Sequence, residues 1–464
     1  MMEILRKKQV QHLYGASLVL LFVLCFFFCS CNNKRQVISD AKVDEDSVII
    51  SRFQKYLQTK TAQPNPNYYE AADFILSEAK SLSLESQIIE FVEGKPLILL
   101  KWPGKDPALA SVMLNSHTDV VPAEEDKWTY PPFEAVLDDE DGNIYGRGTQ
   151  DMKCVGLQYL EAIRRLRRSG FEPMRDVYLS YVPDEEVGGN DGAKRFVDSF
   201  IFEKMNVGVV VDEGGASPDE YYRVFYAERT PWWLVIKASG APGHGAKLYD
   251  NTAIGNLMKS IESITRFRDA QFDLVKAGLM AESEIVSVNT VYLKAGTQSE
   301  DGYVMNMQPS EAEAGFDIRV PPTIDEASLE ARIAEEWAPR SRNMSFEFKQ
   351  KVSVYDKFGK PVITATDESN PWWSLLVEAI SKAGGKLGKP EIAPASTDAR
   401  YYRDRGLPAI GFSPIANTPI LLHDHNEFLN KDEYLKGIQV YESIIKEYAS
   451  FVGNTKDNTR NEEL

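Results

Sequence analysis

The sequence predicts an α/β protein in which a small α+β domain interrupts a larger domain with a largely parallel core sheet. From residue 48 to 230, strand and helix patterns alternate, which is typical of a parallel sheet covered by helices. From residue 231 to 352 the order becomes strand, helix, strand, strand, helix, strand, which is the ferredoxin-like order. Between residues 353 and 452 the first kind of pattern resumes, so we expect the larger domain to continue there.

Apolar runs predict the strands of the larger domain, and an apolar repeat of three to four residues predicts its helices. The expected strands cover residues 97–101, 111–116, 177–182, 207–211 and 409–413, and the expected helices cover 67–81, 153–168, 192–200, 371–383 and 431–451.

The inserted segment follows the same rules. Its expected strands cover residues 232–238, 285–293, 312–319 and 344–351, and its expected helices cover 251–267 and 324–337.

Composition narrows the class of protein. The chain has 464 residues, of which 43% are hydrophobic and 26% are charged. These values exclude a wholly disordered chain, a collagen-like protein and a multi-span membrane protein. The formal net charge of −17 gives no sign of a basic patch, so we expect no nucleic-acid partner.

The first 31 residues differ from the rest. Basic residues at positions 6–8 precede an apolar run at 16–28 and then Cys31, a pattern that resembles a bacterial lipoprotein signal peptide with Cys31 as the lipid-bearing residue. The alternative is an uncleaved N-terminal anchor. Both interpretations predict a membrane-anchored body outside the cytoplasm, in the periplasm or at the cell surface. Two polar segments complete the division of the chain: a tether at 32–47 and a tail at 453–464.

Histidines and acidic residues cluster directly after the expected strands. The carboxyl ends of parallel strands meet at one edge of a sheet, so these side chains are expected to converge. Imidazole and carboxylate groups together form a ligand set that suits zinc, manganese or cobalt. The residues that follow expected strands are His117, Asp119, Glu185, Glu186 and Asp212; Asp151 lies just before an expected helix, and His423 lies in a short acidic segment.

Each of these residues also has a structural explanation. His117 alone is typical of a buried histidine with a satisfied hydrogen bond, and Asp151 is typical of a helix N-cap. The paired glutamates suit the first turn of a helix, Asp212 suits a turn, and His423 suits a solvated loop. Separate explanations do not account for the coincidence of all these residues at strand ends, which favours a metal site.

Several motifs carry a resemblance to a known family. The body of the chain resembles the zinc-dependent aminoacylases, within the larger family of di-zinc peptidases that includes carboxypeptidases and dipeptidases. The resemblance runs in order from about residue 50 to 452, and the paired tryptophan segments favour the aminoacylase branch. The matching segments are 114–122, 147–153, 183–189, 231–233, 242–244, 370–373 and 421–425.

The resemblance implies a di-zinc catalytic domain with an inserted lid or dimerisation domain. Two Zn²⁺ ions, with Co²⁺ or Mn²⁺ as alternatives, would activate a water. Glu185 would be the general base, and Asp119 would orient the imidazole of His117. The implied metal ligands are His117 and Asp212 on one ion, Glu186 and His423 on the other, and Asp151 between them.

The resemblance also implies substrate contacts and a homodimer. His244 would reach the partner subunit's site and stabilise the oxyanion. Asn306 and Arg319 would hold the substrate carboxylate, with Arg400 as a further candidate. For Arg319 the residues alone suggest an ordinary arginine on a strand surface.

The predicted activity is hydrolysis of N-acyl-L-amino acids to a carboxylate and a free L-amino acid. A dipeptidase or carboxypeptidase on the same metal site is the first alternative, because both reactions cleave an amide beside a free carboxylate. A surface binding protein with an inactive site is the second. The presence of every required ligand and of Glu185 weighs against this second alternative.

Overall fold

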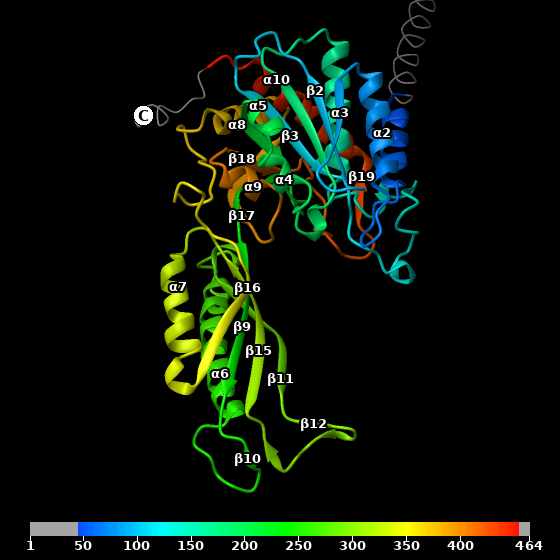
Figure 1. Ribbon diagram of the computed structural model, residues 1–464. Coiled ribbons are helices and arrows are strands. Elements are labelled where there is room, and N and C mark those ends of the chain that lie inside the picture. The colour runs from blue at the N-terminus through cyan, green and yellow to red at the C-terminus, as the bar shows by residue number, and fades with distance from the viewer. Residues whose placement is uncertain (1–44, 454–464) are drawn as a thin grey trace, which may run out of the picture. The chain divides into compact units, whose positions relative to one another are not determined.

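The larger sheet of the protein has eight strands in the order β1-β2-β6-β3-β7-β18-β8-β17 (Figure 1). Neighbouring strands run parallel from β6 through β3 and β7 to β18, and β8 runs parallel to β17. The other pairs are antiparallel. The strands are β1 (Glu85–Glu90), β2 (Pro96–Trp102), β3 (Ser111–His117), β6 (Val177–Val182), β7 (Val207–Asp212), β8 (Tyr221–Glu228), β17 (Lys386–Ala393) and β18 (Ala409–Phe412).

This computed structural model describes residues 45–453. Residues 45–55 are helical and form a unit of their own, and the rest of the described chain forms a second unit. The predicted signal segment with Cys31 lies outside the described residues, as do nearly all of the tether and the tail.

Helices cover both faces of the larger sheet. Gly156 in α3 (Lys153–Arg168) faces the side chain of Ser116, whereas Tyr402 in α9 (Ala399–Asp404) donates a hydrogen bond to Asn115. Neighbouring residues of a strand point to opposite faces, so these helices lie on opposite sides. Helix α10 (Lys431–Ser450) packs against α3, and α8 (Pro371–Lys382) packs against α10. Helices α4 (Ala193–Val197) and α5 (Phe200–Lys204) pack with α9. Helix α2 (Tyr68–Ser81) contacts β1 and β2.

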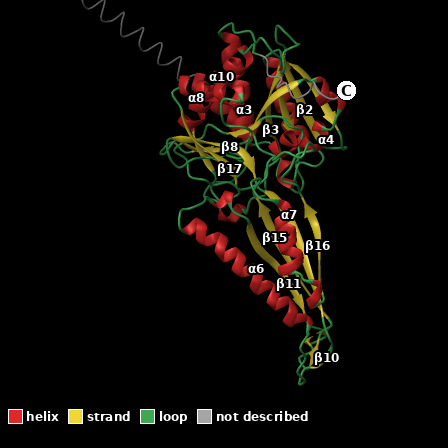
Figure 2. Ribbon diagram, turned by 90° about the vertical axis from the view of Figure 1, so that its left-hand side faces the viewer, coloured by secondary structure: helices red, strands yellow, loops and turns green. Residues whose placement is uncertain are grey.

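The inserted segment forms an antiparallel sheet in the order β11-β15-β9-β16, as the ferredoxin-like pattern predicts (Figure 1). Figure 2 shows β11, β15 and β16 of this sheet in a view turned by 90°. Leu234 and Ile236 of the sheet share one buried cluster with Leu257 and Trp337 from the helices, so both helices pack on one face. The elements are β9 (Thr230–Ser239), α6 (Ala253–Lys276), β11 (Ser287–Ala295), β15 (Glu311–Val320), α7 (Glu326–Arg332), which continues as a wider turn (Ile333–Trp337), and β16 (Met344–Lys351).

Short strands complete the described chain. A three-stranded sheet joins β19 (Phe428–Asn430), β5 (Asn143–Tyr145) and β4 (Val136–Leu137), and two-stranded pairings join β10 (Gly243–His244) to β14 (Met307–Gln308) and β12 (Gln298–Ser299) to β13 (Gly302–Tyr303).

Most expected elements are present, with a few differences. The expected helix 192–200 is two short helices, because the Ser199 side chain accepts a hydrogen bond from Phe202 N and starts a new helix. Strands β8 and β17 were not expected. In β8 the apolar run is only the four residues between Arg223 and Glu228, and β17, which carries Gly388 and Pro390, forms no apolar run. The domain boundaries at 230/231 and 352/353 stay predictions.

Candidate metal centre

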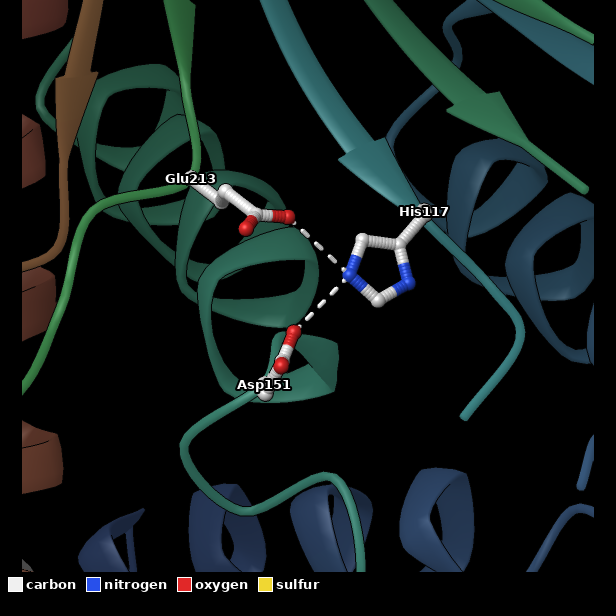
Figure 3. A group of neighbouring side chains, drawn as sticks. All are labelled: His117, Asp151 and Glu213. Carbon is white, nitrogen blue, oxygen red and sulfur yellow. Dashed lines mark hydrogen bonds and ion pairs between the residues drawn. The ribbon is translucent and has the colours of Figure 1, made fainter. Parts of the chain in front are cut away.

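His117 ends β3, a strand whose seven residues are all buried. Its Nδ1 atom lies 2.9 Å from the backbone oxygen of Asp119. Its Nε2 atom lies 2.9 Å from Asp151 Oδ1 and 3.2 Å from Glu213 Oε2 (Figure 3). When Nδ1–H donates to the backbone acceptor, Nε2 carries the free lone pair that a metal ligand needs.

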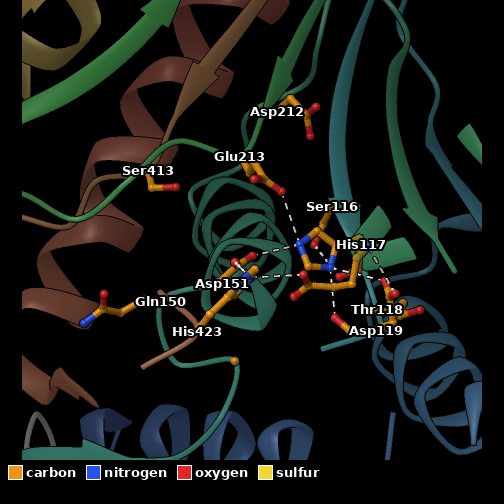
Figure 4. Close-up of polar contacts among 12 residues, drawn as sticks. Ser116, His117, Thr118, Asp119, Gln150, Asp151, Asp212, Glu213, Ser413 and His423 are labelled. Carbon is orange, nitrogen blue, oxygen red and sulfur yellow. Dashed lines mark hydrogen bonds and ion pairs between the residues drawn. The ribbon is translucent and has the colours of Figure 1, made fainter. Parts of the chain in front are cut away.

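Asp151 lies between two histidines, at the end of the loop that leads into α3. One of its carboxylate oxygens faces His117, and the other, Oδ2, lies 3.2 Å from His423 Nε2 (Figure 4). The side chain is only 8% exposed. A carboxylate with one imidazole at each oxygen has the arrangement expected of a ligand shared by two cations.

Glu186 and His423 complete the second half of the cluster. Glu186 Oε2 lies 3.1 Å from His423 Nε2. The candidate ligand atoms of Asp151, Glu186 and His423 all lie within 4.8 Å of one another, and so do those of His117, Asp151 and Glu213. The structure therefore contains two overlapping triads that share Asp151.

Glu213, and not Asp212, belongs to the triad around His117, which corrects the sequence-based assignment. Asp212 is the last residue of β7, and its Oδ1 accepts a hydrogen bond of 2.9 Å from Asn115 Nδ2. Adjacent side chains at a strand end point in different directions, so one residue of an Asp-Glu pair faces His117 and the other faces away. The residue types alone could not identify which of the two faces the site; the register of β7 against β3 does.

The electrostatics of the cluster show an excess of buried negative charge. Burial, followed by the charge of Asp151, raises the pKa of Glu186 to about 7 and that of Glu213 to about 8. Hydrogen bonding to Asp151 and Glu186 raises the pKa of His423 to about 10. The carboxylates thus favour the binding of protons or metal cations between them.

The donor set fits divalent metal ions. Glu186 Oε1 is buried and has no hydrogen-bond partner in the described part of the chain, and the buried Glu213 Oε2 lies 3.2 Å from His117 Nε2. Buried oxygens without a partner are costly, and coordination to a cation would satisfy them. Imidazole nitrogen with carboxylate oxygen is a typical zinc, cobalt or manganese ligand set. The candidate ligands are His117, Asp151, Glu186, Glu213 and His423.

Glu185 lies beside the triads but belongs to neither. It begins a short 3-10 turn (Glu185–Val187) directly after β6, and it is 9% exposed. Burial, followed by the charge of Glu213, raises the pKa of Glu185 well above its ordinary value. A buried carboxyl with a raised pKa at the edge of a metal cluster is suited to proton transfer.

Asp119 contacts one residue of each triad, His117 and Glu186. Its Oδ1 lies 3.4 Å from His117 Nδ1, and its Oδ2 accepts hydrogen bonds from Gln63 Nε2 at 2.8 Å and from Glu186 N at 3.3 Å. The Asp119 carboxylate thus lies beside the imidazole of His117, and the orienting role that the family resemblance implies for it stays a prediction. Gln63 was missed, because an isolated glutamine 56 residues earlier carries no sequence signal for this contact.

Of the predicted substrate residues, Arg400 contacts the loop that carries Glu185 and Glu186. Its Nη2 donates a 2.9 Å hydrogen bond to the backbone oxygen of Gly188, just beyond the Glu185 turn. The other three lie in the inserted segment, where their described contacts are local. His244 pairs with Met307 in β10–β14, Asn306 accepts a backbone hydrogen bond from Gly245, and Arg319 forms an ion pair of 2.9 Å with Asp317 on β15.

Comparison with known proteins gives one consistent family. The model of peptidase family M20/M25/M40 matches residues 113–447. Aminoacylase-1 of Mus musculus is 42% identical over 86% of this chain and 95% of its own length. Aminoacylase-1 of Dictyostelium discoideum is 42% identical over 85% of this chain and 96% of its own length. A probable carboxypeptidase S-like protein of the same organism is only 26% identical, over 80% of each chain.

Solved structures show the same fold. Aminopeptidase PepT from Bacillus cereus has a TM-score of 0.67 at 16% identity, covering 87% of this chain and 99% of its own. The YXEP protein of Bacillus subtilis, a dinuclear metal-binding peptidase from family M20, has a TM-score of 0.61 at 15% identity, covering 86% and 97%.

The prediction of a signal peptide and a lipoprotein is wrong. The matches to aminoacylase-1 of Mus musculus and Homo sapiens, which take in 95% and 97% of those proteins, contradict the classification of the chain as a lipoprotein. A lipid anchor at Cys31 is therefore withdrawn. The extracytoplasmic location stays a prediction. Within residues 45–453, no helix has both the length and the apolar character to cross a membrane.

The correction at the end of β7 can be tested by metal content. Glu213→Gln removes a carboxylate that faces His117, so we expect roughly 10-fold weaker metal binding or more. Asp212→Asn changes a group that faces Asn115 and is expected to keep the wild-type metal content. Elemental analysis after dialysis measures both. Loss of metal from Asp212→Asn, with retention by Glu213→Gln, would contradict the assignment.

Proposed function

This chain belongs to peptidase family M20/M25/M40 and is a metal-dependent amidohydrolase of the aminoacylase type, and we propose that it cleaves N-acyl-L-amino acids with two zinc ions. One observation carries the reaction class: Asp151 is shared by two triads of metal-ligand type, and Glu185 lies beside them. The aminoacylase relatives support the substrate class. The products are a carboxylate and a free L-amino acid.

In this proposal, His117, Asp151 and Glu213 hold one zinc ion, and Asp151, Glu186 and His423 hold the other. Bound zinc supplies Lewis acidity and lowers the pKa of a coordinated water to about 7. His117 is oriented for ligation by the backbone oxygen of Asp119, which fixes its tautomer.

Glu185 moves the proton. Its carboxylate accepts a proton from the attacking water as the oxygen bonds to the acyl carbon. It then delivers that proton to the amine nitrogen as the C–N bond breaks. Burial raises the pKa of the Glu185 carboxyl, which favours its uptake of the proton from water. Water is consumed, and no other reactant is needed.

The substrate carboxylate calls for a cationic partner. Arg400 is held beside the Glu185 turn through Gly188, and its guanidinium supplies a positive charge for a carboxylate. We assign His244, Asn306 and Arg319 to the same substrate, contributed by the inserted domain of a second copy in a homodimer. The aminoacylase relatives, and the roles that the family resemblance implies, support this assignment.

A substrate panel tests the proposed activity. The metal-free chain is expected to be inactive, and added Zn²⁺ is expected to restore hydrolysis of N-acetyl-L-amino acids above that of dipeptides. Release of free amino acid is measured for N-acetyl, longer N-acyl and dipeptide substrates. Full activity without metal would contradict the metal site, and a preference for dipeptides would favour the dipeptidase alternative.

The role of Glu185 can be separated from metal binding. Glu185→Gln keeps the shape of the side chain but removes the base, so we expect a loss of about 10²-fold or more in kcat with unchanged metal content. Glu391→Gln, at the ion pair with Arg223 on the sheet edge, is a control that keeps activity. Turnover near the wild-type value in Glu185→Gln would refute the assignment.

Shared sites can be tested with hybrid dimers. His244→Ala and Glu185→Gln should each be inactive alone, but a mixture should regain part of the wild-type activity, because one of the two sites in each hybrid has both residues. Subunit exchange is confirmed by mass-tagged copies. Exchange without any recovery would contradict a site built from two subunits.

A further inference from the structure

Glu427 is a fully buried carboxylate that contacts the loop leading to Asp151. It accepts hydrogen bonds from the backbone N–H groups of Gly148, Gln150 and Asp151, the shortest being 2.7 Å from Gln150 N. Arg147 Nη1 and the hydroxyl of Thr149 donate to it as well. A single side chain therefore receives donors from five consecutive residues.

Gln150 makes the reciprocal connection. Its Nε2 donates to the backbone oxygens of Pro419 at 3.1 Å and Phe428 at 2.9 Å, and its Oε1 accepts from Leu421 N at 3.1 Å. These three partners lie on either side of His423. The buried side chains of Glu427 and Gln150 thus join the loop that carries Asp151 to the segment that carries His423.

The segment around His423 needs such support. Its backbone is in the left-handed region, with φ of 62°, which is uncommon for a residue other than glycine. Its side chain is 54% exposed, so apolar packing does little to fix the imidazole. A ligand that is not held in place loses conformational entropy when it binds a metal, and this weakens binding.

We propose that Glu427, together with Gln150, is a positioning residue that sets the distance between the metal ligands Asp151 and His423. Neither residue belongs to the two ligand triads. This inference rests on the proposed ligand roles of Asp151 and His423. It predicts that the two residues control metal affinity and geometry beyond any effect on folding.

A matched control exists elsewhere in the chain. Glu228 is also a buried carboxylate, and it accepts from Thr397 N, from the Thr397 hydroxyl and from Arg403 Nη1. It connects the segment before Arg400 to the end of β8, with no contact to a candidate metal ligand among its described hydrogen bonds. Glu228→Gln should therefore reproduce the loss of a buried charge without altering the metal centre.

The experiment compares the full-length wild type with Glu427→Gln, Gln150→Ala and Glu228→Gln. Each metal-free protein is titrated with Zn²⁺ against a chromophoric chelator and with Co²⁺ while its visible absorption is recorded. Unfolding midpoints are measured without metal. We expect roughly 10- to 100-fold weaker binding and an altered Co²⁺ spectrum for Glu427→Gln and Gln150→Ala. Glu228→Gln should keep the wild-type affinity and spectrum.

The outcomes separate this inference from the proposed function. If Glu427→Gln and Gln150→Ala unfold earlier but bind metal as the wild type does, the positioning role is wrong and the metal site stands. An equal loss of affinity in Glu228→Gln would also overturn the role, because any buried charge would then matter. If the wild type itself takes up no metal, the proposed function fails first. If Glu427→Gln does not fold, Gln150→Ala carries the same comparison.

Discussion

The position of the Asp151 carboxylate between two imidazoles is the interaction on which the rest of the site depends. His117 comes from a central strand and His423 from a segment about three hundred residues later, and the Asp151 carboxylate approaches both. Moving either histidine away would leave a buried acid without its partner. With Glu186 and Glu213, three carboxylates face the space that we assign to two divalent ions. Three negative charges offset most of four positive ones, which lowers the cost of keeping the cluster partly buried.

The geometry of the larger sheet explains why these residues meet. β3, β6 and β7 are parallel neighbours, and each ends where the chain turns into a polar loop. The pairing of β3 with its buried neighbours fixes the position of His117 in the sheet. The same pairing places Glu213 toward His117 and Asp212 toward Asn115. The apolar strands thus fix where the site residues lie, and the loops after the strands carry the side chains that can bind metal and transfer protons.

Sequence reasoning could predict the parts that rest on local pattern. Strand β6 and helix α3 were predicted with their observed bounds, because each is a clear apolar or amphipathic run. Strand β17, with its glycine and proline, was missed because it lacks such a run. At the site, ligand types after expected strands indicated His117 and Glu186, and an acid just before an expected helix indicated Asp151. The choice of Asp212 failed because residue type says nothing of side-chain direction, and the roles of Gln63, Gln150 and Glu427 depend on contacts between distant segments.

The loops around the site share a second feature, which is support by buried polar groups in place of an apolar core. Asp184 accepts hydrogen bonds from Asp191 N and Gly192 N and so shapes the loop that carries Glu185. Arg400 holds the far side of that loop through Gly188. A loop with many backbone N–H groups and few apolar side chains cannot be fixed by hydrophobic packing, because its buried donors require acceptors. Carboxylates satisfy several donors at once, so a few buried acids can fix whole loops. Such directional contacts position ligands and a base more closely than packing alone, as a reaction that requires defined distances demands.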